Sequence, residues 1–480
     1  MDIKTNGRLR LHSGKREKMS IQKNCGIGRI VEKQRVFFES GKTFDLGFRK
    51  AALKRLERAI SELEGEICEA LAKDLGKSRT EGYMCEVGLT LGEIREQRRN
   101  LRRWSRTERT GAGLANFPAK GYIVQEPYGT VLIMSPWNYP FMLAIEPLAG
   151  AIAAGNCCVI KPSAYSPATS AVIAKLIRKT FPEGYVTVIE GGRKENAELL
   201  EQRFDYIFFT GSVSVGKLVM EKAAAHLTPV SLELGGKSPC IVDSTAKIPL
   251  AARRIVFGKF LNCGQTCVAP DYVLVEESVK EELLKELIRW TKKMYGDALE
   301  NADYGRIVNK KHFERVRALI DERHVVFGGE AREETLQIQP TILFPVSETD
   351  ACMQEEIFGP ILPVIPVKDM EAARAFVKRR PHPLACYVFT NSRRTERMFM
   401  KETAFGGGCI NDTIMHLTPS KLPFGGVGSS GMGSYHGKKS FETFSHAKSI
   451  LKKSTFLDVT ARYQPYKGWK RLLIRMIGNR

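Results

Sequence analysis

The sequence predicts an α/β fold in which two doubly wound domains carry most of the chain. Short apolar segments suited to buried strands alternate with amphipathic helical patterns between residues 129 and 235. A second alternation of similar size follows Gly235-Gly236, where the chain changes direction. The 480 residues are 43% hydrophobic and 26% charged, so there is enough apolar material for more than one large core.

The composition indicates which partners and which cell compartment to expect. The formal net charge of +21 suits anionic ligands such as dinucleotides, but the basic residues are scattered among glutamates along helical patterns. This scatter favours a solvated basic surface over a nucleic-acid site. Eleven cysteines lack a spacing framework and no signal-peptide pattern follows Met1, so we expect a cytoplasmic protein without disulfides. The least polar run, 140–160, is interrupted by polar residues, so no transmembrane segment is expected.

The first third of the chain suggests an extension followed by scaffold helices. Residues 1–25 are basic and lack apolar periodicity, which predicts a flexible extension. Apolar residues at three- and four-residue steps predict a helix over 44–75, and a second helix is predicted over 81–104. Residues 129–134 indicate a buried strand, which Pro136 ends.

The remaining elements divide between the two alternations. In the first, we expect strands at 157–160, 186–190, 206–209 and 230–234, with helices at 167–181, 196–202 and 215–226. In the second, we expect helices at 249–260, 279–294, 311–322 and 370–377, with strands at 272–275, near Ile342, at 361–364 and at 385–389. A glycine-rich loop follows at 423–431, and 441–451 suits a late strand.

A basic amphipathic helix is predicted close to the C-terminus. Its apolar and basic residues are Trp469, Leu472, Leu473, Met476 and Ile477 against Lys470, Arg471 and Arg475. A helix of about 12 residues is too short to span a bilayer. Packing of this helix on its own protein is favoured over weak contact with a membrane surface.

Cys267 lies between Gly264 and Pro270, so we expect it on a constrained loop where a thiol could meet a ligand. The simplest interpretation is a small buried side chain, because free cysteine is among the most buried residue types. A zinc pair with Cys263 is disfavoured, since no second cysteine pair follows and no histidine is near; no metal is expected. The third interpretation, a nucleophile, requires partners elsewhere in the chain.

Residues suited to ligands follow several predicted strands of the first unit, where ligands of open α/β sheets gather. Gly211, Ser212 and Gly216 lie between a strand and a helix, and they form either a tight turn or a phosphate-binding loop. Lys161 directly follows a strand, and it is either a surface lysine or a donor to a ribose or phosphate.

Asn138 and Glu233 have two interpretations each. Asn138 follows a strand and precedes a helix, so its side chain could cap that helix or donate to a developing oxyanion. Glu233 is a carboxylate in an otherwise apolar strand end. It could face solvent or a salt bridge, whereas burial near the cysteine would raise its pKa and suit it to act as a general base.

Seven motifs, in matching order, resemble the aldehyde dehydrogenase superfamily, most closely its class 3 branch. They are SPWNYP at 135–140, KPS at 161–163, FTGS at 209–212, LELGGK at 232–237, GQTCVAPDY at 264–272, EEIFGP at 355–360 and PFGG at 423–426. The resemblance covers nearly all of residues 30–465. It implies NAD- or NADP-dependent oxidation of an aldehyde to a carboxylic acid, with medium or long aliphatic or aromatic aldehydes as substrates.

The resemblance implies a role for each candidate residue. Cys267 would attack the aldehyde and carry a thiohemiacetal and then a thioester. The Asn138 amide and the Cys267 backbone N–H would stabilise the oxyanion, and Glu233 would activate the hydrolytic water. The implied cofactor contacts are Trp137, Lys161, Gly211, Ser212, Gly216, Leu234, Glu356 on the nicotinamide ribose, and Phe358 beside the ring.

The resemblance also implies a domain plan. A dinucleotide-binding domain would comprise 26–116 and 129–235, and a catalytic domain would comprise 236–429. An oligomerisation element at 117–128 and 443–453, which usually builds a homodimer in this branch, would be followed by a basic tail at 454–480. Ala164 stands where many relatives carry a glutamate that repels the 2′-phosphate of NADP, so we expect NADP to be accepted at least comparably to NAD.

Two other functions remain open at the level of the sequence. The same scaffold could acylate coenzyme A or act as an esterase, although a carboxylate at position 233 favours hydrolysis. A non-catalytic binding protein is the second alternative. The joint presence of Cys267, Glu233 and Asn138 argues against it.

Overall fold

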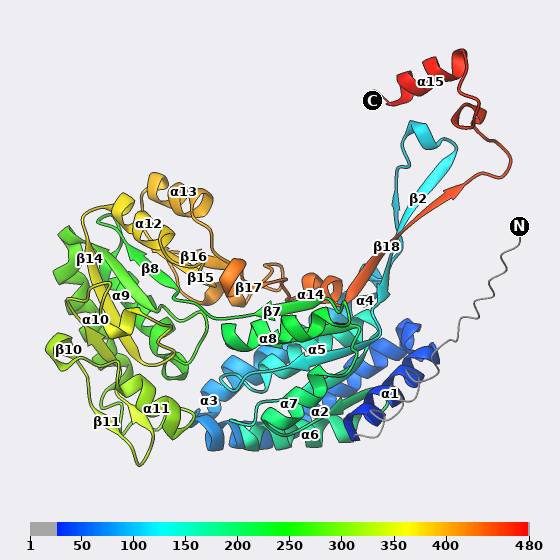
Figure 1. The fold of residues 1–480 in the computed structure, drawn as a ribbon. Coiled ribbons are helices and arrows are strands. Elements are labelled where there is room, and N and C mark those ends of the chain that lie inside the picture. The colour runs from blue at the N-terminus through cyan, green and yellow to red at the C-terminus, as the bar shows by residue number, and fades with distance from the viewer. Residues whose placement is uncertain (1–25, 479–480) are drawn as a thin grey trace, which may run out of the picture.

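The computed structural model describes residues 26–478, so the flexible extension expected at 1–25 lies outside the described residues. Two α/β bodies lie side by side, and a β arm projects from one of them (Figure 1). The first body is built on a six-stranded sheet and the second on a seven-stranded sheet. The predicted fold class, two α/β units plus a small β element, is confirmed.

The six-stranded sheet has the order β17-β7-β6-β3-β4-β5. Its strands are β3 (Thr130–Met134), β4 (Cys157–Lys161), β5 (Val186–Val188), β6 (Tyr206–Thr210), β7 (Val230–Glu233) and β17 (Gly431–Met432). All pair in parallel except β17, which returns from late in the chain and runs antiparallel to β7. The parallel strands therefore end at one edge, where Met134 is in register with Lys161 and Thr210 with Glu233.

Helices cover both faces of this sheet because successive strand residues point to opposite sides. Leu132 and Met134 pack with α1 (Gly26–Glu39), α7 (Arg193–Leu200) and α8 (Val213–Ala224). Val131 and Ile133 belong to the core on the other side. The helices of that side are α2 (Leu46–Leu75), α4 (Gly88–Trp104), α5 (Met142–Ala154) and α6 (Pro167–Thr180).

The seven-stranded sheet has the order β10-β13-β14-β9-β8-β15-β16. Its strands are β8 (Pro239–Val242), β9 (Tyr272–Glu276), β10 (Val325–Phe327), β13 (Thr341–Leu343), β14 (Ile361–Val367), β15 (Ala385–Phe389) and β16 (Gly407–Ile410). Cys240 and Val242 share a core with α9 (Ile248–Phe260) and α10 (Lys280–Tyr295). Ile241 points to the opposite face and shares a core with α11 (Lys310–Arg317), α12 (Met370–Lys378) and α13 (Arg393–Glu402). Outside this sheet, β11 (Ala331–Arg332) and β12 (Gln337–Ile338) form a small antiparallel hairpin.

The arm consists of β1 (Glu108–Thr110), β2 (Ala119–Pro127) and β18 (Ser445–Lys453), all antiparallel (Figure 1). Most side chains of β18 are exposed. The C-terminal helix α15 (Trp469–Gly478) lies near the tip of the arm. Within the described part of the chain, every helix is too short or too polar to cross a bilayer.

Several element boundaries differ from the predictions. The late strand starts at Ser445 rather than 441, because α14 (Lys438–Thr443) packs its buried face against α5. The helix predicted over 311–322 ends at Arg317, and Asp321 begins a separate turn. The helix predicted over 81–104 is split by a π-helical turn at Tyr83–Val87.

The predicted packing of the C-terminal helix on its own protein is only slight: α15 contacts the short turns Leu114–Asn116 and Thr460–Arg462, and most of its apolar face stays exposed. Trp469, Leu472 and Met476 are 61%, 62% and 56% exposed. The helix lies beside the arm rather than on either body, so its apolar face has no core to join (Figure 1).

Candidate active site

Cys267 follows a strained turn at the end of α9. Asn262 and Cys263 have φ angles of 52° and 53°, and Gly264 has 72°. Left-handed backbone costs a non-glycine residue about 1–3 kcal/mol and is concentrated at functional sites. At Gly264 a Cβ atom would lie 2.2 Å from the Gly359 carbonyl oxygen, so only glycine fits there. The turn brings Cys267, which is partly buried, into the wall of a cavity.

This cavity has a volume of about 440 Å³ and a mainly apolar lining. Besides Cys267, it is lined by Tyr139, Leu143, Phe257, Ile414, Phe424 and Tyr435. Glu146 and His436 add a polar patch, with 3.6 Å between the Glu146 Oε2 and His436 Nε2 atoms. A larger groove at the base of the arm contains none of the predicted site residues. The apolar cavity is therefore the space in which a ligand can meet the thiol.

The surroundings of Cys267 favour the neutral form of its thiol. Burial raises the pKa of Cys267, and its electrostatic interactions with the Glu356 and Glu233 carboxyl groups raise it further. The backbone N–H groups of Cys267 and Val268 oppose this rise only weakly. Attack by this sulfur on a carbonyl carbon therefore requires an acceptor for its proton.

Asn138 lies in the loop after β3 and is only 3% exposed. Its side-chain Nδ2 donates to the Gln265 carbonyl oxygen at 3.0 Å, which ties it to the segment just before Cys267. An amide nitrogen carries two hydrogens, so one remains for a ligand. The helix-cap interpretation is wrong, because α5 begins at Met142 and Phe141 precedes it as the cap residue.

Glu233 is the last residue of β7 and is 2% exposed. Neither of its carboxylate oxygens has a hydrogen-bond partner within residues 26–478. Burial raises the pKa of Glu233 well above its ordinary value. The alternatives of a solvent-facing or salt-bridged side chain are therefore wrong, and the structure presents an unpaired carboxyl group at the sheet edge.

Other unpaired polar atoms gather at the same edge. The Ser135 and Thr210 hydroxyls, which follow β3 and end β6, are buried without hydrogen-bond partners in the described residues. Buried polar groups are normally paired, so a cluster of unpaired ones at the carboxyl ends of parallel strands fits a ligand site.

The residues predicted to bind the dinucleotide lie around this edge. Gly211 and Ser212 precede the first turn of α8, where free backbone N–H groups suit a pyrophosphate. Gly216 lies against Leu234, since a Cβ atom at Gly216 would lie 2.6 Å from the Leu234 Cδ2. Lys161 ends β4, and its ammonium donates to the Pro162 carbonyl oxygen at 2.7 Å. Burial lowers the pKa of Lys161 to about 8.

The last three predicted contacts come together from both bodies. The rings of Trp137 and Phe358 are 5.2 Å apart between centroids and meet edge to face. Glu356 lies directly against Gly235, where a Cβ atom would clash with its carboxylate. Burial raises the pKa of Glu356 to about 8, with a further contribution from the Asp271 charge. These positions fit a nicotinamide dinucleotide lying across the sheet edge.

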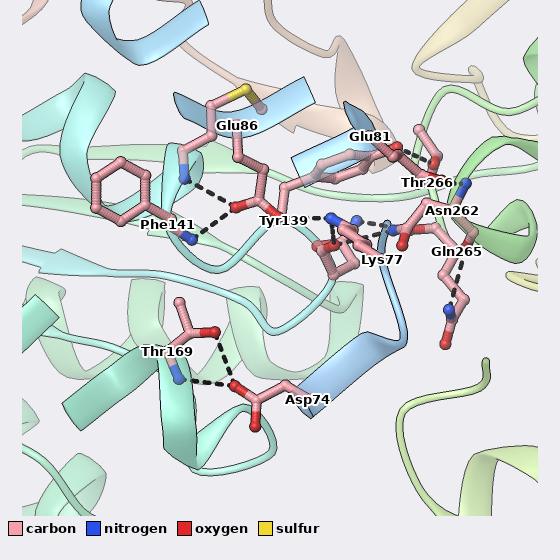
Figure 2. Close-up of polar contacts among 12 residues, drawn as sticks. Asp74, Lys77, Glu81, Glu86, Tyr139, Phe141, Thr169, Asn262, Gln265 and Thr266 are labelled. Carbon is pink, nitrogen blue, oxygen red and sulfur yellow. Dashed lines mark hydrogen bonds and ion pairs between the residues drawn. The ribbon is translucent and has the colours of Figure 1, made fainter. Parts of the chain in front are cut away.

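One group of site residues was missed by sequence reasoning. Lys77, Glu81 and Glu86 lie between α2 and α4, and all three are directed at the two loops of the site (Figure 2). Their spacing falls within a charged helical pattern that does not differ from a solvated surface. The only local signal is their position next to a short break between two predicted helices.

Comparison with known proteins places the chain in a family. The model of the aldehyde dehydrogenase family matches residues 20–450. The 4,4'-diaponeurosporen-aldehyde dehydrogenase of Staphylococcus aureus is 51% identical over 437 residues, 90% of this chain and 95% of that protein. The dimeric NADP-preferring aldehyde dehydrogenase of Rattus norvegicus is 46% identical over 442 residues, 92% of this chain and 98% of that protein.

A solved structure agrees with this assignment. The substrate-bound state of Staphylococcus aureus AldH superposes with a TM-score of 0.93 at 49% identity, covering 94% of this chain and 99% of that one. The predicted resemblance, including its class 3 branch, is confirmed, since the similar proteins include family 3 members A2 and B1. The chain belongs to the aldehyde dehydrogenase family and oxidises aldehydes with NAD or NADP.

Proposed function

We propose that this enzyme oxidises apolar aldehydes to carboxylic acids, with Cys267 as nucleophile, Asn138 as oxyanion donor and Glu233 as general base. One observation carries the proposal. The Cys267 thiol lines an apolar cavity, and the unpaired, buried Glu233 carboxyl lies close enough to raise the pKa of that thiol. A buried carboxyl with no partner is costly to the fold, and a role in proton transfer explains why it is kept.

The first half of the reaction forms a covalent adduct. The Cys267 sulfur bonds to the aldehyde carbon, the carbonyl oxygen gains negative charge, and the thiol proton is released to solvent water in the cavity. The free hydrogen of the Asn138 amide and the backbone N–H of Cys267 donate to that oxygen. A bound NAD⁺ or NADP⁺ would supply the hydride acceptor for this oxidation, and Cys267 would then carry the acyl group as a thioester.

The second half releases the acid. Glu233 takes a proton from water, the resulting hydroxide attacks the thioester carbon, and the C–S bond breaks to give the carboxylic acid and the Cys267 thiol. The raised pKa of Glu233 makes it a strong enough base for this step. Trp137, Lys161, Gly211, Ser212, Gly216, Leu234, Glu356 and Phe358 would hold the dinucleotide.

The cavity supports long aliphatic or aromatic aldehydes over small polar ones. Phe257, Ile414 and Phe424 give it an apolar wall, and apolar surface is the main source of affinity for such chains. The relative from Staphylococcus aureus is named for a polyene aldehyde, 4,4'-diaponeurosporen-aldehyde. We therefore include conjugated long-chain aldehydes in the proposed class.

Ala164 supports use of NADP as well as NAD. It is exposed in the loop after Lys161, and its own side chain brings no carboxylate that would repel a 2′-phosphate. Replacing Ala164 by Glu should lower kcat/KM for NADP by about tenfold or more and change the value for NAD much less. Initial rates with both cofactors check this, and a hundredfold preference of the wild type for NAD would contradict it.

A homodimer through the β arm is the proposed assembly. The outer edge of β18 pairs with no strand in residues 26–478, and a nine-residue exposed edge is a template for another chain. The rat relative is named as dimeric. Sedimentation should give the mass of two chains, and a monomeric mass at micromolar concentration would contradict the proposal.

The C-terminal tail supports weak contact with an anionic membrane surface. Its helix exposes Trp469, Leu472 and Met476 and carries Lys470 and Arg471 without an acidic residue. Pelleting with anionic but not zwitterionic vesicles, lost on deletion of 469–480, is the expected result. If the protein pellets with neither kind of vesicle, the proposed membrane contact is wrong, and the proposal of a cytoplasmic enzyme stands without it.

The direct test of the proposed function is an aldehyde panel. Reduced-cofactor absorbance is followed with aldehydes from short aliphatic to long-chain and aromatic, with NAD and NADP in parallel. We expect kcat/KM to rise with apolar chain length and turnover to vanish in Cys267→Ala. Equal rates for short and long aldehydes would overturn the substrate class, and release of an acyl-coenzyme A product would overturn the hydrolytic step.

A further inference from the structure

We propose that Lys77 is a positioning residue, which fixes the main chain of Asn138 so that its amide is aimed at the oxyanion. The inference rests on the proposed role of Asn138. Lys77 touches none of the reacting atoms, and it acts through the backbone of the residue that does. Nothing in its sequence context distinguishes it from the many surface lysines of the chain.

Lys77 is completely buried, and its ammonium group makes three contacts. Its side chain is 0% exposed, and its ammonium donates to the Glu86 Oε1 at 2.5 Å and to the Asn138 carbonyl oxygen at 2.9 Å. The ammonium also lies 4.1 Å from the centre of the Tyr139 ring. Two of the three contacts of this buried cation are therefore made to consecutive residues of one active-site loop.

Glu86 holds the end of the same loop, at Phe141 and Met142. Its Oε2 accepts the backbone N–H of Phe141 at 2.8 Å and of Met142 at 3.2 Å, at the start of α5 (Figure 2). These N–H groups have no partner within the helix, and the helix end is positive, so a carboxylate suits them. The Lys77–Glu86 pair thus spans the loop from Asn138 to Met142.

The loop of Cys267 is tied to the same point. Asn262, held in a left-handed conformation, donates its Nδ2 to the Asn138 carbonyl oxygen at 2.9 Å and to the Gln265 carbonyl oxygen at 3.1 Å. Its backbone N–H is accepted by Glu81 Oε1 at 3.0 Å. The Asn138 carbonyl oxygen therefore receives two donors, one from Lys77 and one from the turn that leads to the thiol.

This arrangement explains why a cation is buried here. With the carbonyl of Asn138 fixed from one side, its Cα–Cβ bond has a fixed direction, and the Nδ2 bond to Gln265 sets the remaining rotation. Loss of Lys77 leaves that peptide free to tilt. A misplacement of about 1 Å at a catalytic group can cost about 100-fold in rate.

The test is a double-mutant cycle on kcat with a long-chain aldehyde. We expect Asn138→Ala to lower kcat by about 100-fold or more, and Lys77→Met to lower it by about 10- to 100-fold with unchanged dissociation constants for NAD and NADP. Combined with Asn138→Ala, Lys77→Met should cost less than about threefold more, because its effect passes through Asn138.

Two further variants protect the test against simple unfolding. Lys77→Met with Glu86→Gln removes both charges and should fold even where Lys77→Met alone does not, while keeping the same kcat loss. Arg49→Met is the matched control, since Arg49 is a buried cation that donates to the Ala153 carbonyl oxygen at the far end of α5. It should lower the melting temperature and leave kcat within about twofold.

The outcomes separate the two proposals. Full activity of Asn138→Ala would overturn the role of Asn138 and the inference with it. An inactive Asn138→Ala in which Lys77→Met still has its whole effect would overturn only the inference, as would a Lys77→Met protein that melts earlier but turns over at the wild-type rate.

Discussion

Two sets of buried ionisable side chains serve the Cys267 site, and they differ in whether their polar atoms have partners. Lys77 and Glu86 are completely enclosed, and every one of their contacts is to a charged partner, a ring or a backbone group of the loops. Glu233 is equally buried, yet both of its oxygens lack partners within the described residues.

The difference separates groups that hold the site from the group that reacts. A paired buried charge is fixed in position and costs the fold little, whereas an unpaired carboxyl must be protonated or destabilise the fold. The unpaired group is free to exchange a proton with water or with the thiol. Breaking the paired set should therefore lower the free energy of unfolding as well as turnover, whereas breaking the unpaired set should lower turnover without loss of stability.

The largest expected effect comes from removing the nucleophile beside the unpaired carboxyl. Cys267→Ala should lower kcat by at least about 10⁴-fold, because no other group can form the thioester. Cys263→Ala is the matched control, a buried thiol four residues earlier. It should retain activity within about threefold, and comparable loss in both variants would show that the loop, not the thiol, was disturbed.

The second largest effect should come from breaking the paired set of Lys77 and Glu86. Glu86→Ala leaves the Lys77 ammonium without a counter-charge and two backbone N–H groups without an acceptor, so we expect a loss of about 3–5 kcal/mol in the free energy of unfolding. Urea denaturation measures this value. A loss below about 1 kcal/mol would show that water enters and replaces the carboxylate.

Breaking the unpaired set should slow hydrolysis without affecting the first step. In Glu233→Gln we expect steady-state kcat to fall by about 100- to 1000-fold, while a burst of reduced cofactor equal to one turnover remains. Stopped-flow absorbance separates the two phases. If the burst disappears as well, Glu233 is needed before the thioester forms, and the proposed division of labour is wrong.

The smallest effect is a gain in stability from the same substitution, and it depends on pH. The folded-state pKa of Glu233 is raised, so the folded protein keeps its proton where the unfolded chain releases it, and stability falls as the pH rises above about 4.5. Glutamine has no proton to lose. Glu233→Gln should thus melt higher than wild type at pH 8 and by a smaller margin at pH 5. Scanning calorimetry at both values checks this, and a margin that is equal at the two values or larger at pH 5 would contradict a raised pKa of Glu233.

Sequence reasoning reached the parallel strands and the residues at their ends, because alternation and strand-end polarity are local signals. Cys267, Asn138 and Glu233 could be named through motifs, and the structure brings the loops of Cys267 and Asn138 together through Gln265. Whether Glu233 was paired could not be inferred, since partners come from distant segments. The roles of these residues stay predictions until they are tested.

The role of Lys77, Glu81 and Glu86 in holding the two site loops could not be predicted from the sequence for the same reason. Their contacts to the two site loops join residues 55 to 181 positions apart, and no helical spacing indicates them. The return of β17 beside β7 was also missed, because a glycine-rich segment gives no strand periodicity. The sequence did not predict that the C-terminal helix would be exposed, because an amphipathic pattern predicts a buried face and does not identify the surface that covers it.

The most direct measurement of the central claim is intact-protein and peptide mass spectrometry of Glu233→Gln after one turnover with NAD and a long-chain aldehyde. The account predicts an added mass equal to the acyl group, located on the peptide that contains Cys267, and its slow loss in water. Wild type should show little of this adduct at steady state. A full burst of reduced cofactor with no adduct on Cys267 would contradict the account.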